Sequence, residues 1–399
     1  MKEYENISQF RLSTGGLFYR LLLQCKLIEK DQYEPWRRIV IFSVLTWLPL
    51  LVMTAIDGTM FGGFVDIPFL SDPVPHCRFL VSLPLLFIAD RTIDPSVAYA
   101  VRHFKICDLV PDESDSNFRK TVDRLIHQRD MLWVDVILFA MAIAMVWIVI
   151  IKFSGYLPEA NTSSWIYTIK GSQQTLTPAG WWLAFVSSPF MLFVLFRWIW
   201  RMIIWIQFLN RVSHLRLILQ PTHPDQMGGL GPLSSAQFSF GILFSAVGVM
   251  MSSTLANDII HAGRGLEELQ WEILGFVLIC IAIITSPLCT FFTQLFDTKR
   301  IGLGNYSTLA YKLSEKFQIQ WIEKKNVGVP GGSSIAGVSP SDVADYKPLY
   351  DTVSNMRLIP LKKNKLVSLI AILVMPFIPL VFTQISMGAL ARRLIEMLI

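Results

Sequence analysis

The sequence predicts an all-α protein, a polytopic membrane helix bundle with about seven transmembrane helices and additional amphipathic surface helices. Only 16% of its 399 residues are charged, whereas 53% are hydrophobic, and the mean hydropathy is +0.47. A soluble protein of this size needs more charge to cover its surface. The chain also contains a series of apolar segments long enough to cross about 30 Å of hydrocarbon as helices. Its function therefore lies within or beside a bilayer.

The order of elements follows from these apolar segments. Residues 1–38 are polar and basic, which favours a cytosolic N-terminal segment over a cleaved signal. The region 39–293 then holds six crossings. Next comes a cytosolic helical region at 294–365, with a flexible linker at 326–340. The stretch 366–399 contains the seventh crossing and an amphipathic C-terminal helix. The predicted crossings are 39–57, 76–93, 131–151, 180–205, 234–256, 272–292 and 366–385.

The segment 76–93 has the shortest apolar run, because Phe79 to Ala89 covers only about 16 Å of helix. It forms either a crossing or a re-entrant half-helix. A crossing places all the strongly basic stretches on one side, as the positive-inside rule requires. We therefore predict seven crossings, with the N-terminus in the cytosol and the C-terminus outside.

Charged residues in or near the predicted crossings are candidates for a substrate or ion path, because an intramembrane charge is costly unless it is paired or hydrated. Arg197 and Arg201 lie one turn apart near the cytosolic boundary, where snorkelling to the surface also explains them. Topology brings them to the depth of Asp90 and Asp135. We therefore predict a polar cluster that acts as a gate, an anion site or a structural clamp. The predicted path comprises His76, Arg78, Asp90, Arg91, Asp135, Arg197 and Arg201.

The stretch 221–233, "PTHPDQMGGLGPL", separates two apolar segments. Its prolines end a helix and its glycines permit unusual backbone angles, which favours a sharp cytosolic turn. The alternative is an anion site formed by free backbone N–H groups at a helix start. The J-domain signature that shares the His-Pro-Asp triplet belongs to a soluble bundle, and a phosphate loop would need Lys-Ser/Thr after its glycines. The candidate anion-site residues are His223, Asp225, Gly228, Gly229 and Gly231.

Other site classes receive little support from the sequence. The six histidines are dispersed and no nucleophile motif occurs, so we predict neither a metal site nor catalytic residues, and no cofactor is identified. The basic residues form no aromatic-basic stripe of the kind that binds nucleic acid. Lys362, Lys363 and Lys365 either attract anionic lipid headgroups or only set the topology. No repeat long enough to indicate an inverted-repeat transporter is evident, and the sequence leaves a homo-oligomer open.

Three stretches together indicate a resemblance: "LTWLPLLVM", "IPFLSDPVPHCRFLVSLPLLFIAD" and "THPDQMGGLGPL". They resemble a group of uncharacterised bacterial multi-spanning inner-membrane proteins with an HPDxxGGLG cytosolic motif, over most of the chain. The resemblance implies a bacterial inner membrane. It supplies no activity and no catalytic residue.

The favoured function is that of a channel or transporter, because intramembrane charges occur beside prolines such as Pro84 inside predicted crossings. A membrane-embedded enzyme acting on a lipid-linked or phosphate-bearing substrate is the second hypothesis. It rests on His223, Asp225 and the arginines of the fourth crossing. A membrane sensor or assembly protein is the third, because of the cytosolic region 294–365.

Overall fold

The protein is described by a computed structural model over residues 10–28, 35–63, 65–153, 163–170, 173–322 and 340–384. These residues are helical apart from turns, loops and one two-stranded hairpin, and six of the helices are long and apolar enough to cross a membrane. The predicted all-α membrane bundle is therefore confirmed, and the protein is an integral membrane protein. The predicted linker at 326–340, except Pro340, and the C-terminal stretch from 385 lie outside the described residues.

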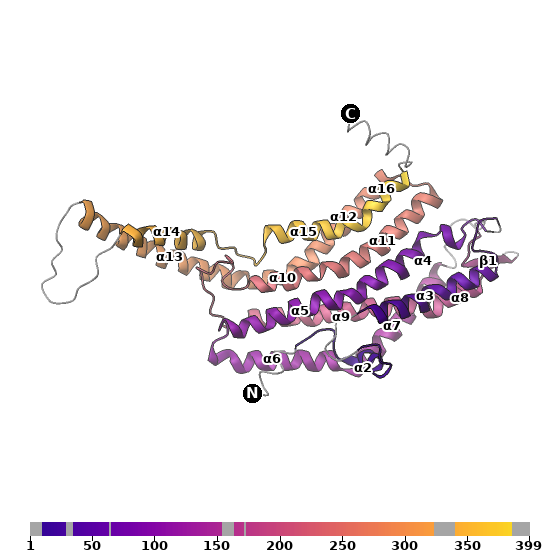
Figure 1. The fold of residues 1–399 in the computed structure, drawn as a ribbon, viewed down its shortest axis with the longest axis horizontal. Coiled ribbons are helices and arrows are strands. Elements are labelled where there is room, and N and C mark those ends of the chain that lie inside the picture. The colour runs from indigo at the N-terminus through magenta and orange to yellow at the C-terminus, as the bar shows by residue number, and fades with distance from the viewer. Residues whose placement is uncertain are drawn as a thin grey trace, which may run out of the picture.

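The elements keep the labels of Figure 1, in which the bundle lies with its long axis horizontal. From the N-terminus to the hairpin they are α2 (Gly16–Gln24), α3 (Trp36–Ile56), η1 (Phe69–Ser71), α4 (Pro73–Cys77), η2 (Arg78–Ser82), α5 (Leu83–Ile106), α6 (Asp112–Asp130), α7 (Leu132–Phe153), β1 (Tyr167–Lys170) and β2 (Gln173–Leu176). From the hairpin onward they are α8 (Pro178–Trp182), η3 (Leu183–Ser187), α9 (Ser188–Ser213), α10 (Gly231–Ser239), α11 (Gly241–Ala262), α12 (Leu266–Thr285), η4 (Ser286–Phe291), α13 (Phe292–Phe317), η5 (Gln318–Ile322), α14 (Pro340–Ser354), α15 (Lys363–Val374), η6 (Met375–Phe377) and α16 (Ile378–Gln384).

The predicted short crossing at 76–93 lies in one continuous helix formed by α4, η2 and α5. This helix is not among the six long apolar ones, because Arg78, Asp90 and Arg91 interrupt its apolar run. It nevertheless occupies the middle of the bundle, where α5 packs against α3, α9, α10 and α11 and buries residues on most of its turns. A helix surrounded by protein can contain polar residues that a lipid-facing helix cannot, because neighbouring helices satisfy them.

Several helices are longer than a membrane requires. The helical stretch Pro178–Ser213 is about 54 Å long at 1.5 Å per residue, against about 30 Å of hydrocarbon. We call the end of the bundle where α6 packs against α9 the α6 end. Phe104, Phe118 and Phe208 are buried together there. α13 and α14 project beyond it as a paired arm (Figure 1).

The opposite end of the bundle, the hairpin end, is organised around Trp165. β1 and β2 pair antiparallel, with Tyr167 opposite Leu176. The fully buried Trp165 donates its indole N–H to Asp72, 3.0 Å away, and its backbone carbonyl accepts a 2.7 Å hydrogen bond from Thr177. Asp72 and Thr177 are the N-caps of α4 and α8, so Trp165 joins the starts of two bundle helices through its side chain and its backbone carbonyl.

These two helices are built alike, a feature that the sequence analysis did not detect. Each begins with a capping residue and a proline, changes to a π-helical turn after five residues, and resumes as an α-helix with Pro84 or Pro189 at its start. The last residue of each π turn, Ser82 or Ser187, donates its hydroxyl to a carbonyl of a neighbouring helix at 2.7 Å. Proline removes a backbone donor, and the wider turn accommodates that loss.

Candidate functional site: a buried charge cluster under the N-terminal segment

Six charged side chains from four bundle helices gather towards the α6 end. Asp90 lies at their centre: one carboxylate oxygen accepts from Arg38 Nη1 at 2.6 Å, and the other accepts from Arg201 Nη1 at 3.0 Å. These three side chains are each 10% exposed or less. The charge cluster comprises Arg38 of α3, Asp90 and Asp94 of α5, Asp135 of α7, and Arg197 and Arg201 of α9.

A second ion pair joins α7 to α9. Arg197 Nε donates to Asp135 Oδ1 at 2.9 Å, and both side chains are buried. The guanidinium groups also lie over aromatic rings, Arg197 over Phe18 at 4.8 Å and Arg201 over Trp198 at 4.7 Å. With three arginines and three aspartates, the cluster is balanced in formal charge. Such pairing makes buried charge tolerable.

The N-terminal cover, which we define as residues 10–24, completes the cluster. Its backbone N–H groups at Leu12 and Ser13 donate to the fully buried Asp94, each at 3.0 Å, and the Ser13 hydroxyl donates to the same carboxylate. Arg201 Nη2 donates to the Ser13 carbonyl at 2.8 Å. The N–H of Phe18 donates to the second oxygen of Asp135 at 2.8 Å. The cover therefore supplies the hydrogen bonds that the bundle helices leave unmade.

The cover can approach this closely because of two glycines. Gly15 and Gly16 have φ values of +93° and +80°, which other residues adopt only with strain. A Cβ at position 16 would lie 2.6 Å from Asp135 Oδ2. Phe18 then packs edge-on against Phe193 of α9, with ring centroids 5.4 Å apart, and anchors the start of α2. The turn and its aromatic anchor thus fix the cover to the bundle.

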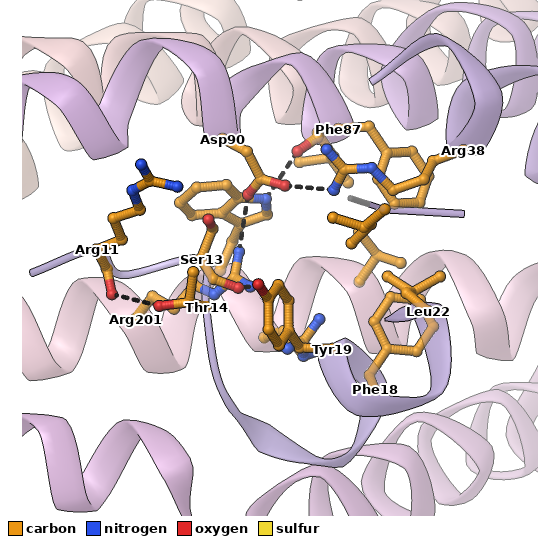
Figure 2. A pocket seen from close by; sticks show the side chains of 15 residues that line it. Arg11, Ser13, Thr14, Phe18, Tyr19, Leu22, Arg38, Phe87, Asp90 and Arg201 are labelled. Carbon is orange, nitrogen blue, oxygen red and sulfur yellow. Dashed lines mark hydrogen bonds and ion pairs between the residues drawn. The ribbon is translucent and has the colours of Figure 1, made fainter. Parts of the chain in front are cut away.

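A small cavity of about 40 Å³ remains between the cover and the cluster (Figure 2). Ser13, Thr14 and Tyr19 of the cover face Arg38 and Asp90 across it. One water needs roughly 10–15 Å³ measured in this way, so the space accommodates a few waters. A larger substrate fits only if the cover moves.

The other predicted path residues lie elsewhere. His76 is engaged at the hairpin end, where Trp47 donates its indole N–H to Nδ1 at 2.9 Å and Nε2 lies 3.1 Å from the Phe69 carbonyl. Arg78 precedes Asp90 by twelve positions on one helix, about 18 Å at 1.5 Å per residue. Arg91 is exposed and has no ion pair among the described residues. The structure brings together Asp90, Asp135, Arg197 and Arg201, and separates His76, Arg78 and Arg91 from them.

The stretch 221–233 is a turn organised by one carboxylate. Asp225 accepts backbone hydrogen bonds from Met227, Gly229 and Gly231 at 2.7 to 3.2 Å, and His223 Nδ1 lies 2.8 Å from it. Gly228 and Gly229 have φ values of +65° and +97°. The N–H groups predicted to hold an external anion thus already hold the side chain of Asp225. The stretch also lies away from the cluster, since Gly228 and Gly229 approach Leu295, Met356 and Leu109.

A cleft of about 520 Å³ lies beside this turn. Pro224, Asp225 and Gln226 form one side, and Arg357 joins the three lysines of the predicted lipid-headgroup cluster on the other. Lys362, Lys363 and Lys365 stand at the start of α15. The topology therefore adds a fourth cation to the lysines, which sequence spacing alone did not predict.

Two cluster members were not predicted as site residues. Arg38 was assigned to the polar N-terminal segment that ends at this residue, although it begins the first crossing. Asp94 lies just beyond the predicted short crossing. The signal that could have found Asp94 is the helical repeat, because Asp94 follows Asp90 by one turn of the same helix face. The role of the cover has no sequence signal beyond the pair Gly15 and Gly16.

No protein-family model, no curated protein and no solved structure matches the chain. Within the described parts of the chain, no group of three or more His, Cys, Asp or Glu side chains is placed to hold a metal ion. The charge cluster, the cover and the cavities are therefore the features of the described residues that bear on function.

Proposed function

We propose that this integral membrane protein is of the transport type, a channel or transporter, and that the charge cluster with its N-terminal cover is a closed gate on the cytosolic side. The proposal places the α6 end in the cytosol and, from the resemblance above, the protein in a bacterial inner membrane. The observation that supports it most strongly is the cover itself. Buried charges of the bundle are satisfied by a short segment that can leave without unfolding a bundle helix.

The arrangement of charges also favours a gate over a passive clamp. Each ion pair joins different helices: Asp90 links α3 and α9 to α5, and Asp135 links α7 to α9. Gate opening would separate these helices, and the π turns of η2 and η3 provide places where α5 and α9 can bend. Charges retained at membrane depth commonly belong to a transport path.

The test is flux through liposomes that contain the purified protein. Gly16→Ala would force a methyl group against Asp135 and displace the cover without changing any charge. We expect it to raise the leak of ions or small solutes by about tenfold or more, because a gate destabilised by about 1.4 kcal/mol opens tenfold more often. The measurement is dye-reported flux across a panel of ion and solute gradients.

Gly263→Ala is the matched control, since Gly263 also has a left-handed φ, +67°, but no atom within 4 Å of a Cβ. It should leave flux unchanged. We would abandon the proposal if neither the wild type, Gly16→Ala nor Asp90→Asn passed any ion or solute above the level of empty liposomes.

A membrane-embedded enzyme acting on a phosphate-bearing substrate is the second candidate, and the cleft lined by Arg357 and the three lysines favours it. Against it, His223 and Asp225 bond to each other and to their own turn. Phosphate release from lipid-linked phosphates that disappears in Lys363→Gln would favour this candidate over transport.

A further inference from the structure

A second cavity, the hairpin-end cavity, lies on the hairpin side of the charge cluster and has a volume of about 390 Å³. On α9 its lining ends at Leu192, and that of the small cluster cavity begins at Val194. This volume falls within the roughly 300–1,000 Å³ range of small-ligand sites. Its lining comes from η2, α7, the hairpin, α8, η3, α9 and α11. Most lining side chains are apolar, including Met145, Val149, Leu183, Met191 and Met250. The cavity therefore suits a hydrocarbon chain better than a polar solute.

The cavity opens towards the apolar surface of the bundle. Met145 and Val149 line it and are at the same time 47% and 46% exposed on α7. Both belong to a helix that is long and apolar enough to cross a membrane. A molecule already dissolved in the bilayer can therefore enter sideways, without passing through water.

One cation, Arg78, borders this apolar space. Its Nε is buried without a hydrogen-bond partner, and Nη2 has only a 3.5 Å contact with Thr254 Oγ1. Asp72, six positions earlier, attracts Arg78 electrostatically, but its carboxylate accepts from Val74 N–H and Trp165 Nε1 and forms no ion pair with the guanidinium. No carboxylate among the described residues forms an ion pair with Arg78. An unpaired guanidinium beside an apolar cavity is costly, and an anionic group bound there would remove that cost.

The two π turns shape the site. Arg78 and Phe79 begin η2, and Leu183 and Ala184 begin η3, and all four line the cavity. The π turns η2 and η3, which occur at the same position in two similarly built helices, thus both line the hairpin-end cavity. Such turns recur at binding sites because they widen a helix locally and re-aim its side chains.

We propose that the hairpin-end cavity binds the acyl chain of an anionic membrane lipid, with Arg78 holding its phosphate. A lipid without a phosphate, such as a diacylglycerol, would leave the guanidinium unpaired, and a cation would be repelled by it. A water-soluble anion would gain nothing from the apolar lining. The site is independent of the proposed gate, because it requires neither transport nor movement of the cover.

The experiment measures lipid retained by the purified full-length protein. Protein in neutral detergent is equilibrated with phosphatidylglycerol or with a diacylglycerol of identical acyl chains, and bound lipid is counted by native mass spectrometry. We expect phosphatidylglycerol to bind about tenfold or more tightly than the diacylglycerol, the ratio that one charged hydrogen bond supports. Arg78→Gln should abolish this preference, and Arg78→Lys should retain most of it.

Two further variants separate the headgroup from the chain and guard against misfolding. Ala184→Phe fills the cavity while leaving Arg78 in place, and should reduce retention of both lipids. Arg264→Gln removes an exposed arginine paired with Asp258 and Glu272 in the α11–α12 loop, and should change nothing. The proposal would be overturned if Arg78→Gln preferred phosphatidylglycerol as strongly as the wild type does. It would also be overturned if Arg264→Gln lost this preference equally, or if Ala184→Phe retained as much lipid as the wild type. Displacement of phosphatidylglycerol by millimolar inorganic phosphate would also overturn it, since the site would then be one for free phosphate.

Discussion

Both the charge cluster and the hairpin-end cavity contain arginine, but of these two sets only the arginines of the cluster form ion pairs with described residues. In the cluster, Arg38, Arg197 and Arg201 each meet a carboxylate within 3.0 Å. At the cavity, Arg78 has one long contact with a hydroxyl. The cluster leaves only about 40 Å³ of space, whereas the cavity offers about 390 Å³.

This difference separates two roles for buried charge. A balanced network has little charge left for a ligand, so its natural functions are to hold helices together or to release them. An unbalanced charge beside empty apolar volume is suited to a partner from outside. The sequence predicts one path through the charges of the cluster and Arg78. The structure instead separates a cluster of paired charges from an arginine beside an apolar cavity.

The largest effect is expected from breaking the cluster at its centre. Asp90→Ala leaves Arg38 and Arg201 buried without their carboxylate, and removing one partner of a buried pair costs about 3–5 kcal/mol. Unfolding in detergent micelles, followed by tryptophan fluorescence, should show this loss. Arg91→Ala is the control on the neighbouring position, where the exposed side chain should contribute less than about 0.5 kcal/mol. An equal loss of stability in both variants would mean that the ion pairs of Asp90 with Arg38 and Arg201 do not stabilise the protein.

An effect of opposite sign is expected at the cavity. Arg78→Met replaces a half-buried cation that forms no ion pair with any described residue by an apolar side chain of similar length, and removing its buried, unsatisfied Nε should stabilise the protein by about 1 kcal/mol. The same micelle unfolding assay applies, in the absence of anionic lipid. Added phosphatidylglycerol should stabilise the wild type and not the variant. A destabilised Arg78→Met protein would contradict the contrast with Asp90.

The smallest effect concerns the exposed contact between Asp66 and Ser163 at the hairpin end. Hydrogen bonds from the backbone N–H and then the hydroxyl of Ser163 lower the pKa of Asp66 below its ordinary value of 3.8. Because the folded-state pKa is lowered, this contribution is present above pH 3.8 and is lost as the pH falls through the lowered value. The acid limb of a melting-temperature profile should therefore be slightly flatter in Asp66→Asn than in the wild type. An identical acid limb would show that the contact between Asp66 and Ser163 contributes nothing to stability.

The sequence predicts how deep in the membrane each charged residue lies, but not which residues it contacts. Hydropathy and helix length place Asp90, Asp135, Arg197 and Arg201 at one level, because position along a helix converts directly to distance. The same reasoning joined Arg78 to Asp90, since both lie on one predicted crossing. Their spacing of twelve helical positions, about 18 Å, already separates the two along the helix, but periodicity does not report which neighbouring helix each residue faces.

The N-terminal cover shows the limit most clearly. Residues 10–24 belong to the basic stretch 1–38 that was predicted to be cytosolic, and the hydrogen bonds of their backbone N–H and C=O groups have no signature in a sequence. Only the fold shows that Ser13, Gly15 and Phe18 meet charges of α5, α7 and α9. Contacts of this kind depend on where the chain returns, which local composition does not determine.

By itself, the sequence determined that this protein is a helical membrane protein with charges at membrane depth and a proline- and glycine-rich turn at 221–233. The physical reason is that solvent preference and helical geometry act locally, residue by residue. Tertiary structure alone decided which charges are paired, that Asp225 occupies its own turn, and that Arg78 faces an apolar cavity without a carboxylate. Pairing and cavities arise between helices distant in the chain, so they exist only once the bundle has packed.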